Sequence, residues 1–374
     1  MSIKVKRGEL VFPSPDDVRQ LAMFSLRVEN LFKTNKRVWD SLSAEDCNLF
    51  VEDVFNHYKR NGFPYPHYTN SELWDDFNAL KGQYLHDITD NIIVGNNAGR
   101  KLPTIMMPHI WGVKSYGWRS PIETFESDKY LRITIQKVLQ LSPSMSDSSI
   151  RSLLGMAQGA QKVSNFRPSV AKRLYDNYAG EGRVIDFSSG FGGRLTGAFA
   201  SQQVHSYVGF EPASKTFNGL QKIISFLSQD KTLLLDNVRI HNLGSENNWK
   251  ELHDKYLTNA DLCFSSPPYF DTERYSDEET QSYMKFPSKH NWRDNFLVKV
   301  VENCMAALKS GGYLLLNIAN VKRYPELEAD AVAICKECGF VHEQTLWMVM
   351  STLPGGKSTP EKVKTEPIFV FRKE

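Results

Sequence analysis

Hydrophobic side chains in the first 160 residues recur at the spacing of one helix face. The spacing is clearest in two runs, Leu21, Phe24, Leu31 and Phe32, then Leu49, Phe50, Val54 and Phe55. The proline-containing segment 63–68 interrupts it and predicts a loop, because proline disfavours helix at the residue before it. Further helices are expected over 128–139 and 147–156. The pattern predicts a mostly helical N-terminal domain over residues 1–160.

From residue 161 onward, short apolar runs alternate with segments of helical period. Strands are expected over 184–187, 205–210, 260–264, 312–317, 347–350 and 368–372, and helices over 193–200, 214–228, 295–308 and 325–338. This alternation predicts an α/β domain over 161–374, with a mainly parallel sheet covered by helices on both faces. In such sheets ligands bind beyond the carboxyl ends of the strands, so these ends are where a site is expected.

Composition limits the functions that need considering. Lys and Arg number 45 against 43 Asp and Glu, and a formal net charge of +2 excludes a histone-like polycation. Any nucleic-acid surface must therefore be a local patch. Five scattered cysteines do not form a disulfide framework, which favours a reducing, cytoplasmic location. No apolar stretch is long enough for a signal or a membrane span, so no membrane partner is expected.

A glycine-rich loop follows the first predicted strand and leads into a helix: Asp186-Phe187-Ser188-Ser189-Gly190-Phe191-Gly192-Gly193-Arg194. Gly190 and Gly192 allow a sharp turn and a close approach to a ligand. Free N–H groups at the helix start favour a negatively charged ligand group. The spacing is not the G-x-G-x-x-G dinucleotide fingerprint, because the third glycine falls at 193. A tight turn without a ligand is the alternative.

Two further strand ends carry polar candidates. Glu211 ends the second strand of the domain, where a carboxylate can accept hydrogen bonds from both hydroxyls of a ribose. A solvated loop acid is the alternative interpretation of Glu211. Ser245, in the segment 242–246, lies where polar groups could contact the edge of an adenine ring.

The most informative segment is Ser266-Pro267-Pro268-Tyr269, immediately after the strand over 260–264. Two consecutive prolines stiffen the chain and remove two N–H donors, which leaves the Ser266 oxygen and the carbonyls around Pro267 as fixed acceptors. Tyr269 adds a flat face. Such a site suits a planar molecule with an exocyclic amino group, which donates to the acceptors while the ring stacks on the tyrosine.

The tetrapeptide resembles the S/D/N-P-P-Y/F/W motif of methyltransferases that modify exocyclic amino groups. The segment 186–193 resembles their loop for S-adenosylmethionine, and Asn165-Phe166-Arg167-Pro168 resembles the segment that closes over the methionine end of this cofactor. The resemblance covers residues 160–374 and implies a Rossmann-like class I methyltransferase fold. It implies that Ser266, Pro267, Pro268 and Tyr269 are catalytic. The cofactor-binding residues implied are Phe166, Asp186, Ser188, Gly190, Gly192, Glu211 and Ser245.

In this family the serine variant is commonest among cytosine-N4 enzymes, so the resemblance implies DNA as substrate, with cytosine N4 ahead of adenine N6. The implied bacterial or phage enzyme displaces the methyl group directly, without a metal, onto a base flipped out of the duplex, and can belong to a restriction–modification pair. In familiar relatives the target-recognition region follows the cofactor loop. Here only residues 1–160 are large enough, so recognition is assigned to them. The sequence predicts no oligomeric state.

Rival interpretations remain open. Guanine-N2 and glutamine-amide methyltransferases use similar motifs, so RNA or protein is an alternative substrate. An inactive methyltransferase-like protein that binds DNA is another. Lys114-Ser115-Tyr116-Gly117-Trp118-Arg119 mixes cations with aromatic rings as nucleic-acid contacts do, or forms an ordinary packed loop. Cys335 and Cys338 have the spacing of half a zinc site but lack the second pair. Gly355-Gly356-Lys357-Ser358 lacks the first glycine of a phosphate loop.

Overall fold

The computed structural model describes residues 40, 43–83, 88, 90–142, 145–156, 159–350 and 364–374. These residues form two compact units, one from the chain up to residue 66 together with 111–163, the other from 67–110 together with 164–374. One boundary near residue 160 was expected, whereas the chain enters the second unit at residue 67, leaves it after residue 110 and returns at residue 164. The helical run over 21–32 and the segment 355–358 lie outside the described residues.

The first unit is mostly helical. It contains α3 (Ala44–Asn61), β2 (Lys114–Ser115), α6 (Pro121–Glu126), α7 (Asp128–Leu141) and α8 (Asp147–Leu154), so the helices expected over 128–139 and 147–156 are confirmed. The helical spacing in α3 puts Phe50, Val54 and Phe55 into a core with residues of α7 and α8. The buried Tyr58 hydroxyl donates to Asp147 at 2.9 Å, which fixes α3 against the start of α8.

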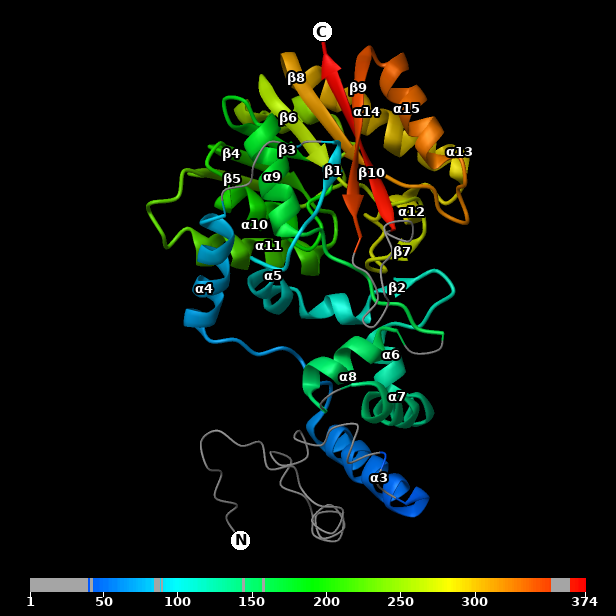
Figure 1. Ribbon diagram of the computed structural model, residues 1–374. Coiled ribbons are helices and arrows are strands. Elements are labelled where there is room, and N and C mark those ends of the chain that lie inside the picture. Colours follow the sequence, from blue (N-terminus) through cyan, green and yellow to red (C-terminus); the bar gives the residue numbers. More distant parts are fainter. Residues whose placement is uncertain are drawn as a thin grey trace. The chain divides into compact units, whose positions relative to one another are not determined.

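The second unit is built on an eight-stranded sheet in the order β1-β9-β10-β8-β6-β3-β4-β5 (Figure 1). The strands are β1 (Ile92–Ile93), β3 (Arg183–Asp186), β4 (Ser206–Phe210), β5 (Asn237–His241), β6 (Ala260–Ser265), β8 (Leu308–Asn317), β9 (Phe340–Val349) and β10 (Thr365–Lys373); a short β7 (Glu273–Arg274) lies apart. Strands β3, β4, β5, β6 and β8 are parallel, and β10 runs antiparallel between β8 and β9. Six of these strands were predicted. The C-terminal strand expected over 368–372 is confirmed as β10, the last strand along the chain.

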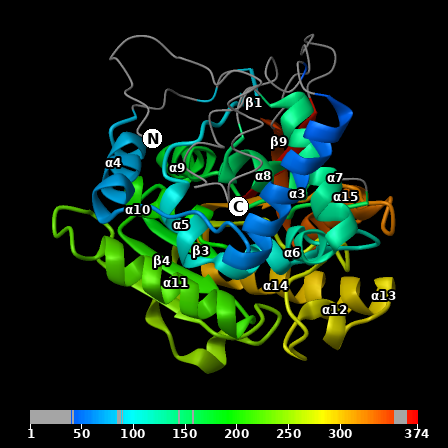
Figure 2. The same cartoon turned by 90° about the horizontal axis from the view of Figure 1, so that it is seen from below.

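Helices cover both faces of this sheet. One layer contains α4 (Asn70–Lys81), α5 (Lys101–Met106), α9 (Pro168–Tyr178), α10 (Gly193–Ala200) and α11 (Ser214–Leu227); the other contains α14 (Val298–Ala307) and α15 (Leu327–Glu337). Figure 2 shows α9 and α14 on opposite sides of β3 and β4. The predicted α/β fold class, with a mainly parallel sheet between two helical layers, is confirmed.

Residue pattern explains the two layers. Inward residues of α14 and α15, among them Val300, Cys304 and the fully buried Cys335, pack with Val208 and Leu314 of the sheet in one core. On the other face Tyr175 of α9 contacts Phe264 of β6, with ring centroids 5.7 Å apart. Helix α4 begins at a capping box between Thr69 and Glu72, which satisfies the first free N–H groups of the helix.

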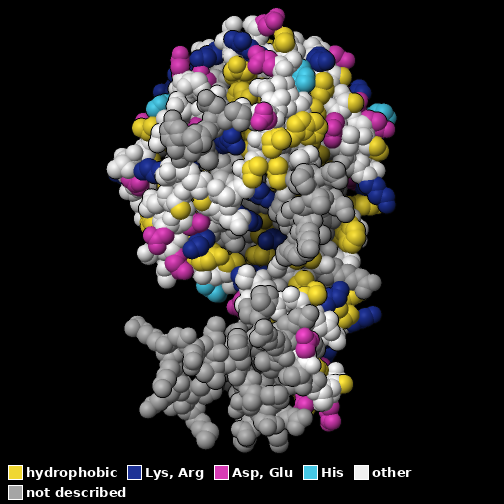
Figure 3. Space-filling view, in the orientation of Figure 1, with side chains coloured by type: hydrophobic (Ala, Val, Ile, Leu, Met, Phe, Trp, Pro, Cys, Tyr) yellow, Lys and Arg dark blue, Asp and Glu magenta, His cyan; other side chains and the backbone are white. Residues whose placement is uncertain are grey.

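Short elements connect the strand ends. They are η2 (Pro108–Gly112), η3 (Trp249–Leu252), η4 (Lys255–Leu257), α12 (Ser282–Lys285), α13 (Lys289–Trp292) and the π-helical turn η5 (Arg293–Leu297). Figure 3 shows hydrophobic side chains gathered on the face that carries β9, where Val341 and Trp347 are exposed, as are Ile92 and Val94 at the β1 edge. No described helix is both long and apolar enough to cross a membrane.

Strand order fixes where a ligand can enter. The five parallel strands from residue 183 onward lie across the sheet in the order β5, β4, β3, β6, β8. After β3 the chain adds strands on one side of it, and from β6 onward it adds them on the other side. In doubly wound sheets this switch point opens a crevice beyond the carboxyl ends of the two central strands. Strand β3 ends at Asp186 and β6 ends at Ser265, directly before the glycine loop and the proline tetrapeptide.

Candidate functional site

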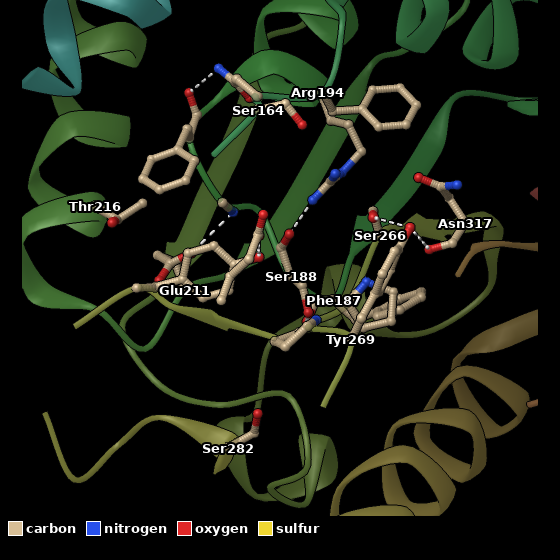
Figure 4. Close-up of a pocket in the computed structure, with 18 of the residues that line it drawn as sticks. Ser164, Phe187, Ser188, Arg194, Glu211, Thr216, Ser266, Tyr269, Ser282 and Asn317 are labelled. Carbon is tan, nitrogen blue, oxygen red and sulfur yellow. Dashed lines mark hydrogen bonds between the residues drawn. The ribbon is translucent and has the colours of Figure 1, made fainter. Parts of the chain in front are cut away.

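A cavity of about 300 Å³ lies at this switch point, within the second unit. Nine of the residues predicted from the sequence line it: Phe166, Ser188, Gly190, Glu211, Ser245, Ser266, Pro267, Pro268 and Tyr269. Figure 4 shows Ser188 and Glu211 on one part of the wall and Ser266 with Tyr269 on another. The structure thus brings the glycine loop and the tetrapeptide to one cavity. Asp186 and Gly192 do not line it.

The glycine loop is shaped by left-handed backbone that side chains rarely adopt. Gly190 has φ 55° and Gly192 has φ 79°, and Gly192 is the N-cap of α10. A Cβ atom at Gly193 would overlap the carbonyl oxygen of Phe166, so the segment before α9 lies directly on the helix start. Asn165 holds the two segments together, because its side chain donates to the Phe191 carbonyl at 2.8 Å and accepts from the Gly193 N–H at 3.3 Å.

Asp186 lies beneath the loop and is fully buried. Its carboxylate accepts from Arg194 Nε at 2.8 Å, from the Tyr207 hydroxyl at 2.6 Å and from the Ser265 hydroxyl at 2.7 Å. Arg194 also donates to the Ser188 carbonyl and lines the cavity. Asp186 therefore acts on the cavity through Arg194 and the loop backbone. Arg194 was missed by sequence reasoning, although it stands next to the predicted glycines.

Glu211 and Ser245 carry the polar groups at one end of the cavity. Glu211 accepts from the Gly190 N–H at 3.0 Å and the Ala213 N–H at 2.8 Å. Burial raises the pKa of Glu211 to about 7 although these two bonds favour the carboxylate. The buried Ser245 hydroxyl and the Gln281 amide nitrogen have no hydrogen-bond partner in the described part of the chain, and both residues line the cavity. Gln281 was not predicted.

The tetrapeptide end contains two acids that the sequence analysis missed. The Tyr269 hydroxyl donates to Glu366 Oε1 at 2.5 Å and lies 3.4 Å from Ser266 Oγ. Glu273 accepts from the Tyr275 hydroxyl. Burial, reinforced by the nearby Glu366, raises the pKa of Glu273 to about 7, and burial raises the pKa of Glu366. No described cation forms an ion pair with either acid, so this end of the cavity suits a ligand that donates hydrogen bonds.

Glu366 could not be found from local sequence. It stands nearly a hundred positions after Tyr269, and only the insertion of β10 next to β8 brings it to the tetrapeptide. Cys335 and Cys338, which have the spacing of half a zinc site, do not line this cavity, and Cys335 is buried in the core beneath α15. Among the described residues no cluster of His, Cys, Asp and Glu has the arrangement of a metal site.

Comparisons with known proteins find distant structural likeness over little more than half of the chain. No family model and no curated protein matches the chain. Many solved structures match part of it. An S-adenosylmethionine-dependent O-methyltransferase from Thermotoga maritima is 13% identical, with 55% of this chain and 64% of that chain covered and a TM-score of 0.35. The chain thus spans just under two thirds of that enzyme.

Two more solved structures have similarly low identity and TM-scores. An rRNA methylase from Streptococcus thermophilus is 13% identical, with 57% of this chain and 100% of that chain covered and a TM-score of 0.34. Aeropyrum pernix fibrillarin, solved with natively bound S-adenosyl-L-methionine, is 12% identical over 54% of this chain and 73% of that chain, with a TM-score of 0.33. Likenesses this distant carry no functional argument, so function has to be argued from the cavity.

Proposed function

We propose that this protein transfers a methyl group from S-adenosylmethionine to an exocyclic amino group of a DNA base, with cytosine N4 ahead of adenine N6. One observation carries the proposal: a single cavity joins Gly190 and Glu211 to the whole of Ser266-Pro267-Pro268-Tyr269. The two motifs come from different strand ends, so their meeting is a property of the fold. A methyl donor in the glycine loop would lie beside an amine held by the tetrapeptide.

The residues around the glycine loop fit this cofactor. Glu211 offers carboxylate oxygens to ribose hydroxyls, and the orphaned Ser245 hydroxyl offers a partner for the edge of an adenine ring. The loop at Ser188 and Gly190 and the ring of Phe166 would surround the methionine end. Bound S-adenosylmethionine would supply a methyl group already activated on a sulfonium sulfur. The protein therefore needs no metal and no covalent nucleophile for this reaction.

The tetrapeptide would position the acceptor. Tyr269 presents its ring for stacking, and the bond from its hydroxyl to Glu366 anchors the tip of the ring. Ser266 and the carbonyl of Pro267 would accept hydrogen bonds from the amine. Acceptors that are already oriented stabilise the positive charge that grows on the attacking nitrogen. A base within duplex DNA would first be flipped out, at a cost of a few kcal/mol.

One experiment tests the proposal directly. The protein is incubated with methyl-labelled S-adenosylmethionine and separate DNA, RNA and protein acceptors, and labelled nucleic acid is digested to nucleosides. Label in N4-methylcytosine or N6-methyladenine from DNA supports the proposal. Label confined to RNA or protein would replace the substrate class. Absence of label everywhere, together with no thermal stabilisation by the cofactor, would favour an inactive methyltransferase-like protein.

The raised pKa of Glu211 predicts a pH dependence of cofactor binding. The folded, empty protein keeps the Glu211 proton up to about pH 7, whereas the unfolded chain loses it near the ordinary value of 4.5. Glu211 therefore costs stability increasingly as pH rises from about 4.5 to 7. A protonated Glu211 loses acceptors for ribose, so affinity for S-adenosylhomocysteine should fall by up to about tenfold per pH unit below pH 7.

Calorimetric titration between about pH 5.5 and pH 8.5 measures this slope. Glu211→Gln should flatten it. Glu273 has a similar pKa and lines the same cavity, so Glu273→Gln serves as the matched control and should preserve the slope. A slope that disappears in the Glu273 variant and persists in the Glu211 variant would assign the pH dependence to the other acid.

We further propose that the first unit recognises the nucleic-acid target. Trp118 is 48% exposed in the aromatic and basic segment 114–119. Stacking of a base on an aromatic side chain contributes about 1–3 kcal/mol. Trp118→Ala should therefore raise KM for the nucleic acid by roughly 5- to 150-fold with kcat and affinity for S-adenosylhomocysteine unchanged. An unchanged KM would show that the segment 114–119 is a packed loop with no part in binding the nucleic acid.

A further inference from the structure

The proposed reaction relies on Ser266 as one of its two acceptors. A primary amine on a flat ring has two N–H groups, and both need acceptors if the nitrogen lone pair is to point at the methyl donor. The first residue of the tetrapeptide here is serine, whose side chain is shorter than Asp or Asn and carries a hydroxyl in place of a carbonyl oxygen. Ser266 Oγ is already within 3.4 Å of the Tyr269 hydroxyl.

Asn317 lies in the right place to complete the set. It is the last residue of β8, which runs parallel to β6 with Leu316 paired to Ser265. The next residues, Asn317 and Ser266, therefore occupy matching positions at adjacent strand ends. Asn317 is 1% exposed and lines the cavity. Its backbone carbonyl lies 3.4 Å from the Tyr269 hydroxyl, which places the residue directly beside the tetrapeptide.

The orientation of the Asn317 amide follows from its partner. Asn317 Nδ2 donates to the Pro367 carbonyl at 2.9 Å. A backbone carbonyl can only accept, so the amide nitrogen has to face Pro367 and the Oδ1 atom has to face away from it. Figure 4 shows the oxygen on the side of Ser266 and the nitrogen on the far side. No described residue donates to this oxygen.

We propose that Asn317 Oδ1 accepts one N–H of the target amine together with Ser266, while the Pro267 carbonyl accepts the other. The inference rests on the proposed function and adds the end of β8 to its amine site. Rigid positioning supports the assignment, because a bond to β10 holds the amide before any substrate arrives. Asn317 lines the cavity and its Oδ1 atom has no donor among the described residues, so an N–H of a bound amine can satisfy it.

The chemical step balances without further reagents. The nitrogen lone pair forms a bond to the methyl carbon while the carbon–sulfur bond breaks, and its electron pair stays on sulfur as a neutral thioether. The nitrogen then carries a positive charge until one N–H proton passes to water. Asn317 Oδ1 and Ser266 stabilise this charge, and neither takes up the proton. A secondary amine has one N–H and cannot bond to both Asn317 Oδ1 and the Pro267 carbonyl, so transfer should stop after one methyl group.

Asn317→Ala tests the proposal, with DNA methylation and S-adenosylhomocysteine binding measured side by side. We expect kcat to fall about 100-fold, as for removal of one partner of a developing charge, with cofactor affinity within about threefold of the unaltered protein. Asn317→Asp keeps an oxygen toward the cavity but loses the bond to the Pro367 carbonyl, so its kcat should lie between those of the unaltered protein and the alanine variant. Asn320→Ala is the matched control, because Asn320 is exposed and caps α15 through Glu328. It should leave kcat unchanged.

A second measurement separates catalysis from packing. The unaltered protein should prefer an unmethylated target over the same oligonucleotide already carrying one methyl group on the amine, and Asn317→Ala should narrow this preference. Unchanged preference, a kcat within threefold, or a parallel loss of cofactor binding would overturn the role of Asn317. No transfer by the unaltered protein to any acceptor would overturn the proposed function, and this inference with it.

Discussion

Tyr269→Ala is expected to lower kcat by at least about 100-fold and to change the affinity for S-adenosylhomocysteine by less than about threefold. Tyr269 is the flat face of the tetrapeptide end, and its hydroxyl contacts Glu366 and Ser266. It has no hydrogen bond to the glycine loop or to Glu211. Its loss should therefore misplace the acceptor ring and leave the methyl donor bound. Single-turnover rates with saturating cofactor, together with calorimetry, measure the two effects separately.

Tyr269→Phe separates the ring from the hydroxyl. It keeps the stacking face and removes the bond to Glu366, so a loss of about tenfold or less in kcat is expected. Glu366→Gln, which keeps a partner for the hydroxyl, should be milder still. A Tyr269→Ala variant that loses cofactor affinity in proportion to kcat would show that the tetrapeptide has only a structural role. Pro268→Ala should resemble Tyr269→Ala, because the two prolines hold the ring in position.

Three of the six strands that local sequence predicted, β3, β4 and β6, are buried on both faces and appear as largely apolar runs. Strand β5 was missed because Val238 and Ile240 alternate with polar residues at the sheet edge. Helical spacing predicted α4 but could not indicate which core it joins. The stacking of Trp74 on Phe226 of α11, at 4.8 Å, places α4 in the second unit.

The part of the site that could be predicted from the sequence is the part that directly follows the ends of parallel strands. Parallel strands gather their carboxyl ends at one edge, so the glycine loop and the tetrapeptide could be expected together. Asn317 and Glu366 depend on which strand neighbours which, and an antiparallel β10 between β8 and β9 is not visible in the local pattern. Whether Asp186 faces a ligand or lies beneath the loop depends on Arg194, whose side chain direction no spacing rule gives.

Asp186→Ala is expected to lower the free energy of unfolding by about 3–5 kcal/mol, because it leaves the buried Arg194 guanidinium without its counter-ion. That loss is a large share of the ~5–15 kcal/mol by which domains are stable. It also removes the acceptor for Tyr207 and Ser265. The unfolding transition of the second unit in urea measures this loss of free energy. Cofactor affinity should fall as well, since Arg194 would no longer hold the Ser188 carbonyl and the loop in place.

The double variant Asp186→Ala with Arg194→Met decides how Asp186 acts. Replacing both members of a buried pair by apolar groups is less damaging than removing one, so the double variant should be more stable than Asp186→Ala alone. If Asp186 acts on the ligand through Arg194 and the loop, cofactor affinity should stay low although stability returns. Affinity that recovers together with stability would mean that Asp186 matters only for folding. A double variant as unstable as the single one would show that the lost stability comes from the hydrogen bonds of Tyr207 and Ser265, the other two side chains that the carboxylate binds.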